Sequence, residues 1–173
     1  NLLQGCAAVR STASSRKIGS LLKPLLGANP FATRAILFDK LPGANWSVGW
    51  HQDLTIAVAE RIEAPGFGAW TVKDGVPHAQ PPVEILENML ILRLHLDTCG
   101  AENGPLCVLP GSHRHGRLAE SAITDIASRS KAFICAADPG DLLAFRPLLL
   151  HMSRRSARPS HRRVIQVEYA GVE

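Results

Sequence analysis

Short apolar segments separated by Gly/Pro turns limit this chain to few architectures. Turn dipeptides such as Pro42-Gly43, Asp74-Gly75 and Pro139-Gly140 recur after residue 30. The segments predicted to be strands are 34–40, 48–58, 69–72, 89–97, 106–109, 133–136, 142–145 and 164–169. Many short strands, without a helix between each pair, favour an antiparallel sandwich, barrel or jelly roll over βαβ units.

Two segments carry helical periodicity instead. Four leucines recur at helical spacing near the start of the chain: Leu21, Leu22, Leu25 and Leu26. Gly27 and Pro30 then supply a stop, and a second helix is predicted at about 118–131. The segment 63–82 is long and rich in Gly and Pro, so we expect a loop rather than a simple hairpin, forming a lid over a pocket.

Length and composition indicate one ordinary globular domain. The 173 residues are enough for a core of their own, so we expect a single domain over 1–173, with a helical region at 1–30 and a jelly-roll core at 31–173. No apolar run approaches the roughly 18 residues of a membrane span, so we expect a soluble protein without a membrane partner. The acidic-poor opening is similar to a transit peptide, but its leucine spacing favours a helix.

The four cysteines form no CxxC pair, which indicates neither a disulfide framework nor a zinc site and favours a reducing, cytoplasmic location. The net charge of +4 is mild, but arginines gather between Arg146 and Arg163. Such a cluster can mark a nucleic-acid surface. Because the aromatic residues that single-strand binders use are missing there, we expect no nucleic-acid partner and favour a small-molecule substrate.

One polar triplet stands out among the predicted strands. On a strand, residues i and i+2 point to the same face, so His51 and Asp53 of "WHQD" project together while Gln52 points away. This spacing suits two ligands of one metal ion. The pattern alone is weak, because the chain contains a second copy at His95-Leu96-Asp97.

A non-haem Fe(II) site of the two-histidine, one-carboxylate type needs one more histidine. Downstream candidates are His113, His115, His151 and His161. His151 is best placed, because it ends the apolar run "LLAFRPLLLH", although a buried structural histidine is the alternative. Arg162 and Arg163 follow at the start of the last strand, where a guanidinium could fork onto a carboxylate.

The motifs "WHQD", "ENGPLCVLPGSH", "GDLLAFRPLLLH" and "SHRRVIQVEY" together resemble the phytanoyl-CoA dioxygenase family of Fe(II)/2-oxoglutarate-dependent oxygenases, over roughly residues 34–169. The resemblance implies a mainly β fold, a double-stranded β-helix of the jelly-roll, cupin-like type, preceded by helices. It also implies that His51, Asp53 and His151 are both the catalytic residues and the iron ligands. The implied cofactors are Fe(II), 2-oxoglutarate and O2, with ascorbate as a supporting reductant.

The resemblance further assigns the 2-oxoglutarate arginine, eleven positions after the distal histidine, to Arg162. Strand parity supports this choice over Arg163, because Arg162 shares a face with Val164, Gln166 and Glu168. The remaining cosubstrate contacts implied by family positions are Ser153, Trp70, Gln52 and Ile36, for which a loop hydroxyl or a core side chain is the alternative.

The second HxD lies on a strand whose polar face carries Arg93, His95 and Asp97. This face can line the same cavity, with Arg93 as the substrate contact, or it can play a structural role behind the ligands. His113 and His115 belong to the "PGSHRHG" stretch, which resembles a family loop, so they are expected to be loop residues rather than ligands.

The function implied is hydroxylation of a small molecule, with release of succinate and CO2 from 2-oxoglutarate. The alternatives are a non-catalytic cupin-like module that binds a metal or ligand and, less favoured, an oxygenase directed at nucleic acid. Asp53 is present, which disfavours halogenation. The sequence does not identify the substrate or the oligomeric state.

Overall fold

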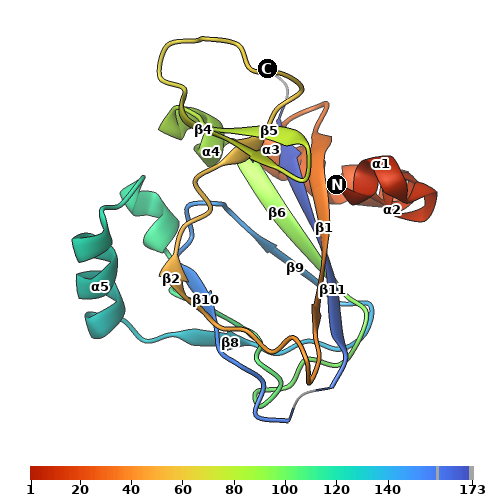
Figure 1. The fold of residues 1–173 in the computed structure, drawn as a ribbon, viewed down its shortest axis with the longest axis vertical. Coiled ribbons are helices and arrows are strands. Elements are labelled where there is room, and N and C mark those ends of the chain that lie inside the picture. Colours follow the sequence, from red (N-terminus) through yellow and green to blue (C-terminus); the bar gives the residue numbers. More distant parts are fainter. Residues whose placement is uncertain (159, 172–173) are drawn as a thin grey trace.

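The computed structural model describes residues 1–158 and 160–171, and its centre is a pair of four-stranded antiparallel sheets (Figure 1). The larger sheet has the order β1 (Phe31–Lys40), β11 (Arg162–Ala170), β6 (Met89–His95) and β9 (Leu142–Phe145). The smaller sheet has the order β2 (Val48–His51), β10 (His151–Ser153), β7 (Leu106–Val108) and β8 (Phe133–Cys135). This arrangement is the double-stranded β-helix that the sequence predicts.

A third sheet covers one end of this pair of sheets. It has the order β3 (Ile56–Ala57), β5 (Val76–Gln80) and β4 (Gly68–Lys73). The prediction of a long loop at 63–82 is therefore wrong, because β4 and β5 form a hairpin. Asp74 and Gly75 both have positive φ, as the tight turn between such strands requires.

The predicted strand 48–58 is also interrupted. β2 ends at His51, and irregular backbone separates it from β3. The backbone N–H of Asp53 donates to the carbonyl of Pro147, 2.9 Å away, rather than to a neighbouring strand. The other predicted strands are present, β9 with the predicted ends and the rest with shifted ends, and β5 and β10 are additional.

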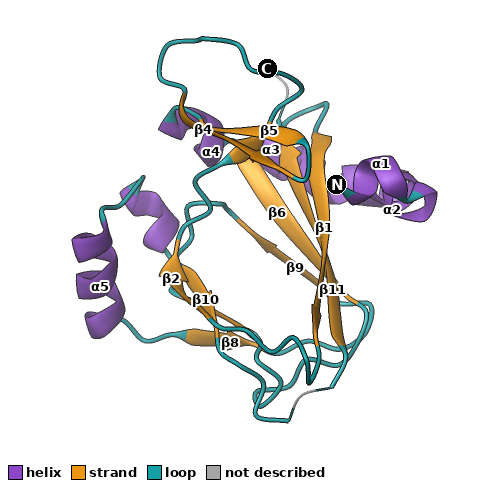
Figure 2. Ribbon diagram, viewed as in Figure 1, coloured by secondary structure: helices purple, strands orange, loops and turns teal. Residues whose placement is uncertain are grey.

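Helices lie on the outside of the sheets (Figure 2). The first 26 residues form α1 (Leu2–Gly5), α2 (Ala7–Ala13) and α3 (Arg16–Leu26). Later helices are α4 (Val83–Glu87), the 3-10 helix η1 (Ser112–His115) and α5 (Glu120–Arg129), where the sequence predicts a helix. Within the described residues, no helix is both long enough and apolar enough to cross a membrane.

The N-terminal helices pack on the outer face of the larger sheet. The apolar face of α3 consists of Ile18, Leu22 and Leu26, whereas Leu21 and Leu25 of the predicted leucine pattern are about half exposed. This face joins a core with buried residues of β1, β6 and β11. The outer face is therefore apolar, which leaves the inner face of the same strands to carry polar side chains.

A second core lies between the two four-stranded sheets. Its buried members are Ile91, Leu106, Val108, Cys135, Phe145 and Leu149. It fills only part of the space between the sheets, and the polar site described next occupies the rest. All four cysteines, Cys6, Cys99, Cys107 and Cys135, are free.

Candidate metal centre and cosubstrate pocket

Two strands bring the three predicted metal ligands together. His51, the last residue of β2, is the direct register partner of His151, the first residue of β10. Their ring centroids are 4.1 Å apart. Asp53 follows two residues after His51, and its two carboxylate oxygens lie 3.8 Å from His51 Nε2 and 3.7 Å from His151 Nε2. One ligand atom from each residue can therefore contact a single ion, since all three lie within 4.8 Å of one another.

Backbone carbonyls fix the tautomer of both imidazoles. His51 Nδ1 lies 2.8 Å from the carbonyl oxygen of Gly49, and His151 Nδ1 lies 2.8 Å from that of Leu149. Because a carbonyl only accepts, each Nδ1 carries the proton, and the Nε2 lone pairs face Asp53. Burial lowers the pKa of His151, which favours the neutral ring that a metal ligand needs.

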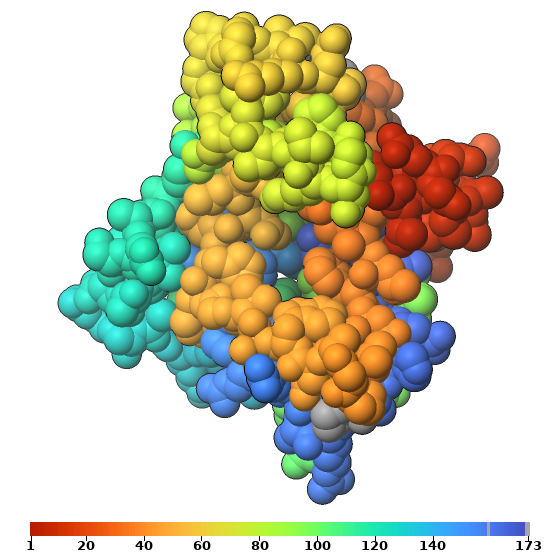
Figure 3. Space-filling model, in the orientation of Figure 1, coloured from red at the N-terminus to blue at the C-terminus, as the bar shows by residue number. Residues whose placement is uncertain are grey.

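The three ligands line a cavity of about 130 Å³ between the two sheets. Its walls also include Phe38, Trp46, Val48, Arg93, Leu106, Ser153, Arg162 and Gln166. Figure 3 shows the surface hollowed between β1 and β2, the strands that carry Phe38 and His51. His151 is 4% exposed, whereas the side chain of His51 is 36% exposed, so the cavity opens on the His51 side.

One end of the cavity is strongly cationic. Arg162 is 2% exposed, and its Nη1 donates to the carbonyl of Gly104 at 3.0 Å, while its Nε has no partner among the described residues. Lys40, the register partner of Arg162, is fully buried and donates from Nζ to Ser153 Oγ at 2.9 Å and to the carbonyl of Arg154. Burial, followed by repulsion from Arg162, lowers the pKa of Lys40 to about 8.

A second buried guanidinium faces the middle of the cavity. Arg93 is 7% exposed, and its Nη1 donates to Gln166 Oε1 at 2.7 Å. Its guanidinium carbon lies 5.2 Å from the centre of the Phe38 ring. Burial and the nearby Arg162 lower the pKa of Arg93 to about 10. The sequence prediction that Arg93 faces the cavity is therefore matched by its position.

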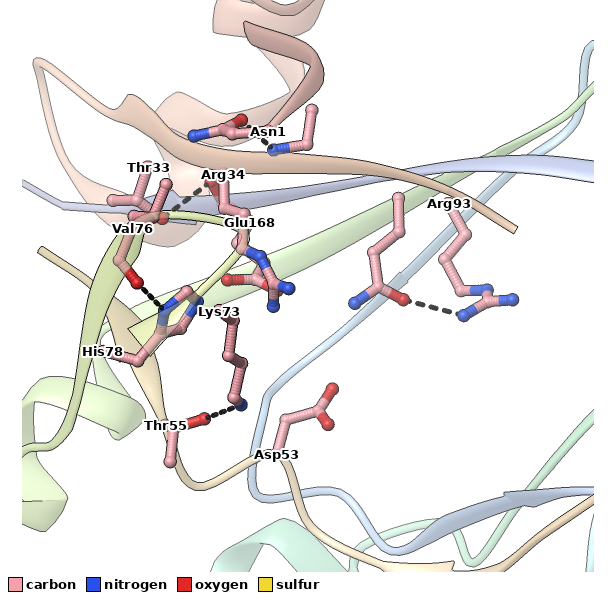
Figure 4. Close-up of polar contacts among 12 residues, drawn as sticks. Asn1, Thr33, Arg34, Asp53, Thr55, Lys73, Val76, His78, Arg93 and Glu168 are labelled. Carbon is pink, nitrogen blue, oxygen red and sulfur yellow. Dashed lines mark hydrogen bonds and ion pairs between the residues drawn. The ribbon is translucent and has the colours of Figure 1, made fainter. Parts of the chain in front are cut away.

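A further group of polar side chains lies at the opposite end of the site, beneath the β4–β5 hairpin (Figure 4). Arg34 Nη1 lies 3.5 Å from Glu168 Oε1, and burial raises the pKa of Glu168 to about 7. Figure 4 shows Glu168 and Arg34 together above Asp53, with Arg93 farther along the sheet. His78 is 1% exposed, and its Nε2 has no partner within the described part of the chain.

Three residues predicted to contact the cosubstrate lie outside this cavity. Gln52 uses its amide on backbone groups, donating to the carbonyls of Gly116 at 2.8 Å and Leu148 at 2.7 Å. Trp70 stacks on Phe67 with centroids 6.5 Å apart. Ile36 lines a separate hollow beside Arg34. The structure does not bring these side chains to the metal ligands, whereas Ser153 and Arg162 do line the cavity with them.

The second HxD does not form a metal centre within residues 1–158 and 160–171. Asp97 instead receives hydrogen bonds from Arg163 at 2.9 and 2.7 Å, and these bonds lower the pKa of Asp97 to about 2. His95 is buried next to Arg93, with neither ring nitrogen paired among the described residues. His113 lies in η1 and does not line the cavity.

Four of the late arginines lie in different surroundings. Arg162 points into the cavity, while Arg163 pairs with Asp97 on the outer face. Two others have separate partners: Arg158 pairs with Glu102, and Arg146 donates to the carbonyls of Met89 and Leu25. These four arginines are close in sequence but have separate partners in the structure.

Sequence reasoning gave no site role to several residues that lie at or beside the cavity. Phe38 and Lys40 share one face of β1; Phe38 lines the cavity, and Lys40 lies beside it and donates to the lining residue Ser153. Gln166, which strand parity places on the face of Arg162, lines the cavity, whereas Glu168 on the same face lines a separate small hollow beside Asp53. Trp46 lies in the segment between β1 and β2 and lines the cavity.

The sequence matches the model of a known protein family. The model for phytanoyl-CoA dioxygenase (PhyH) matches residues 4–164, nearly the whole chain. The chain belongs to the phytanoyl-CoA dioxygenase family. Its His51, Asp53 and His151 form the HxD…H triad of this family. No protein in the curated set matches the sequence.

Solved structures show the same fold. EctD from S. alaskensis with bound Fe has a TM-score of 0.74 at 22% identity, covering 99% of this chain and 55% of that chain. The EctD structure with 2-oxoglutarate and 5-hydroxyectoine has a TM-score of 0.73 at 23% identity, covering 98% and 55%. AviO1 from Streptomyces viridochromogenes Tue57 has a TM-score of 0.65 at 24% identity, covering 95% and 61%. This phytanoyl-CoA dioxygenase family chain thus spans little more than half of these proteins.

Proposed function

We propose that the protein is an Fe(II)- and 2-oxoglutarate-dependent oxygenase that hydroxylates a small molecule with release of succinate and CO2. The observation that carries this proposal is the triad of His51, Asp53 and His151, with both Nε2 lone pairs and the carboxylate directed at one point. Two imidazoles and one carboxylate are the donor set that non-haem Fe(II) oxygenases use, and three protein ligands leave other coordination positions open.

The residues present fit iron. Bound iron with 2-oxoglutarate and O2 would supply the oxidation, and the protein supplies binding and orientation. The Nδ1 bonds to Gly49 and Leu149 hold both rings in one orientation, so the ligand geometry is set before the metal arrives. The hydrogen bond from the Asp53 backbone to Pro147 likewise anchors the carboxylate ligand.

The cationic end of the cavity fits the free carboxylate of 2-oxoglutarate. Arg162 offers a planar fork whose Nε has no partner within the described part of the chain, and the ammonium of Lys40 is held in place by its hydrogen bond to Ser153. Among the described residues that line the cavity, Asp53 is the only carboxylate, so these cations lack an acidic partner within it. A dicarboxylate cosubstrate would provide one.

The first test is spectroscopic. Under anaerobic conditions, purified protein with Fe(II) and 2-oxoglutarate should form the weak visible charge-transfer band of the iron complex. The band should be lost in His51→Ala and in His151→Ala, and retained in His113→Ala, a matched histidine outside the cavity. A band that persists in both ligand variants would refute the proposed metal centre.

A non-catalytic binding module with the same fold is the main competitor. Succinate release from 2-oxoglutarate, measured with ascorbate and without added substrate, separates the two functions, because only an enzyme turns the cosubstrate over. Metal and 2-oxoglutarate binding without any succinate would favour the binding module.

A further inference from the structure

Arg93 is a buried cation that has no anionic partner among the described residues. The only hydrogen bond from its guanidinium to the described residues is that from Nη1 to Gln166 Oε1, and its buried Nε has no partner. No ion pair joins Arg93 to a carboxylate within the part of the chain that the structure describes. A buried, unpaired guanidinium is costly to a fold, so an anion brought from outside would explain its presence.

The cavity contains more positive charge than the cosubstrate can satisfy. Arg93, Arg162 and Lys40 are all less than a tenth exposed, and Asp53, a metal ligand in the proposed function, is the only carboxylate that lines the cavity among the described residues. Of the two carboxylates of 2-oxoglutarate, one would lie at the metal and the other at Arg162 and Lys40. Arg93 would then still lack an anion.

Another arginine of the chain, Arg163, shows the geometry of a guanidinium that is paired with a carboxylate. Arg163 binds Asp97 through two side-chain hydrogen bonds, Nε at 2.9 Å and Nη2 at 2.7 Å. This fork geometry is the usual way in which a guanidinium holds a carboxylate. Arg93 has the same fork, but no carboxylate of the described residues pairs with it, and Arg93 lines the cavity together with the three metal ligands.

We propose that Arg93 binds the carboxylate of the substrate, and that the enzyme acts on a small free carboxylic acid rather than on an ester, amide or coenzyme A thioester. This inference rests on the proposed function and adds the chemical class of the substrate to it.

The neighbours of Arg93 support this role. The Phe38 ring, 5.2 Å from the guanidinium carbon, restricts the plane of the fork, and Gln166 holds one of its nitrogens. The remaining cavity wall includes apolar surface from Phe38, Trp46, Val48 and Leu106. A second anion-binding edge at Arg93, beside these apolar walls, fits a compact acid with an aliphatic body. An ester or thioester has no carboxylate for Arg93.

The test compares acids with their primary amides, which have nearly the same shape but no charge. Propanoate, butyrate, 3-methylbutyrate and cyclopentanecarboxylate are titrated into the anaerobic protein loaded with Fe(II) and 2-oxoglutarate. Binding is measured by calorimetry and by the change in the visible band. We expect at least one acid to bind about tenfold or more tightly than its amide. Equal binding of acid and amide throughout, or binding of no acid, would overturn the inference.

Variants test whether Arg93 is the residue that causes the preference for the acid. Arg93→Gln should remove the preference for the acid, Arg93→Lys should restore part of it, and the matched control Arg163→Gln should keep it, because Arg163 lies on the outer face. The dissociation constant of 2-oxoglutarate is measured in the same proteins. If Arg93→Gln weakens 2-oxoglutarate as much as it weakens the acids, Arg93 binds the cosubstrate and the inference is overturned.

Failure of the proposed function would look different. In that case the wild-type protein would form no band with Fe(II) and 2-oxoglutarate at all. Calorimetry of the same acids and amides, with the Arg93 and Arg163 variants, would still report whether Arg93 selects a carboxylate.

Discussion

Replacing Arg162 by Gln tests the assignment of the 2-oxoglutarate arginine. Arg162 is 2% exposed, one of its nitrogens is held by the Gly104 carbonyl, and its Nε is unpaired within the described residues, so a fork remains for a ligand. Each charge-assisted hydrogen bond contributes about 1.5–3 kcal/mol, and two would contribute about 3–6 kcal/mol. Because Lys40 stays in place beside the same ligand, we expect a net loss of about 2–4 kcal/mol.

That loss corresponds to a 2-oxoglutarate dissociation constant raised by roughly 30- to 1000-fold. The assay is an anaerobic titration of 2-oxoglutarate into the Fe(II) protein, followed by the visible charge-transfer band. Arg163→Gln is the matched control, since Arg163 is adjacent in sequence but pairs with Asp97 on the outer face. If Arg163→Gln weakens binding and Arg162→Gln does not, the reasoning from strand parity is refuted.

Three further predictions concern charge and packing. Lys40 has a pKa of about 8, so its ammonium loses its proton above that pH. The affinity for 2-oxoglutarate should therefore fall between pH 7 and 9. In Lys40→Met the affinity should not change with pH over this range. Burial raises the pKa of Glu168 from 4.5 to about 7, so its contribution favours folding below pH 4.5 and is lost as the pH rises to 7. Glu168→Gln should therefore stabilise the metal-free protein by about 1–3 kcal/mol at pH 8 and by less at pH 5 in urea unfolding, and an equal difference at both values would contradict this. Leu22→Ala, at a site 1% exposed beneath the larger sheet, should cost about 2–5 kcal/mol in the same assay, whereas the half-exposed Leu21→Ala should cost much less.

Strand parity explains what the sequence could predict. Along β11, the alternation that separates Arg162 from Arg163 separates the side chains that face the cavity, Arg162 and Gln166, from those on the outer face, Arg163, Val167 and Tyr169. The HxD spacing and a histidine after an apolar run gave candidates, and the family resemblance singled out the three metal ligands, which the structure brings within 4.8 Å. These features are local, so a single sequence contains them.

Features that depend on long-range pairing could not be predicted in this way. Arg34 faces Glu168 only because β1 and β11 pair in one particular register, which no local pattern specifies. Gln52 was assigned to the cosubstrate by resemblance, but the backbone after His51 leaves the strand and commits the amide to loop carbonyls. The β4–β5 hairpin had a readable turn signal in Asp74-Gly75, which the surrounding glycines and prolines obscured.

The direct pairing of His51 with His151 across β2 and β10 has a consequence for how such a protein can change. An insertion of one residue within either strand would turn an imidazole to the opposite face and abolish the metal centre. Insertions in the connections between strands, such as the turn between β4 and β5 or the segment before β2, leave that register unchanged. Substrate specificity can therefore change through variation in the connecting loops, while the metal centre is kept by the pairing of a single residue on β2 with a single residue on β10.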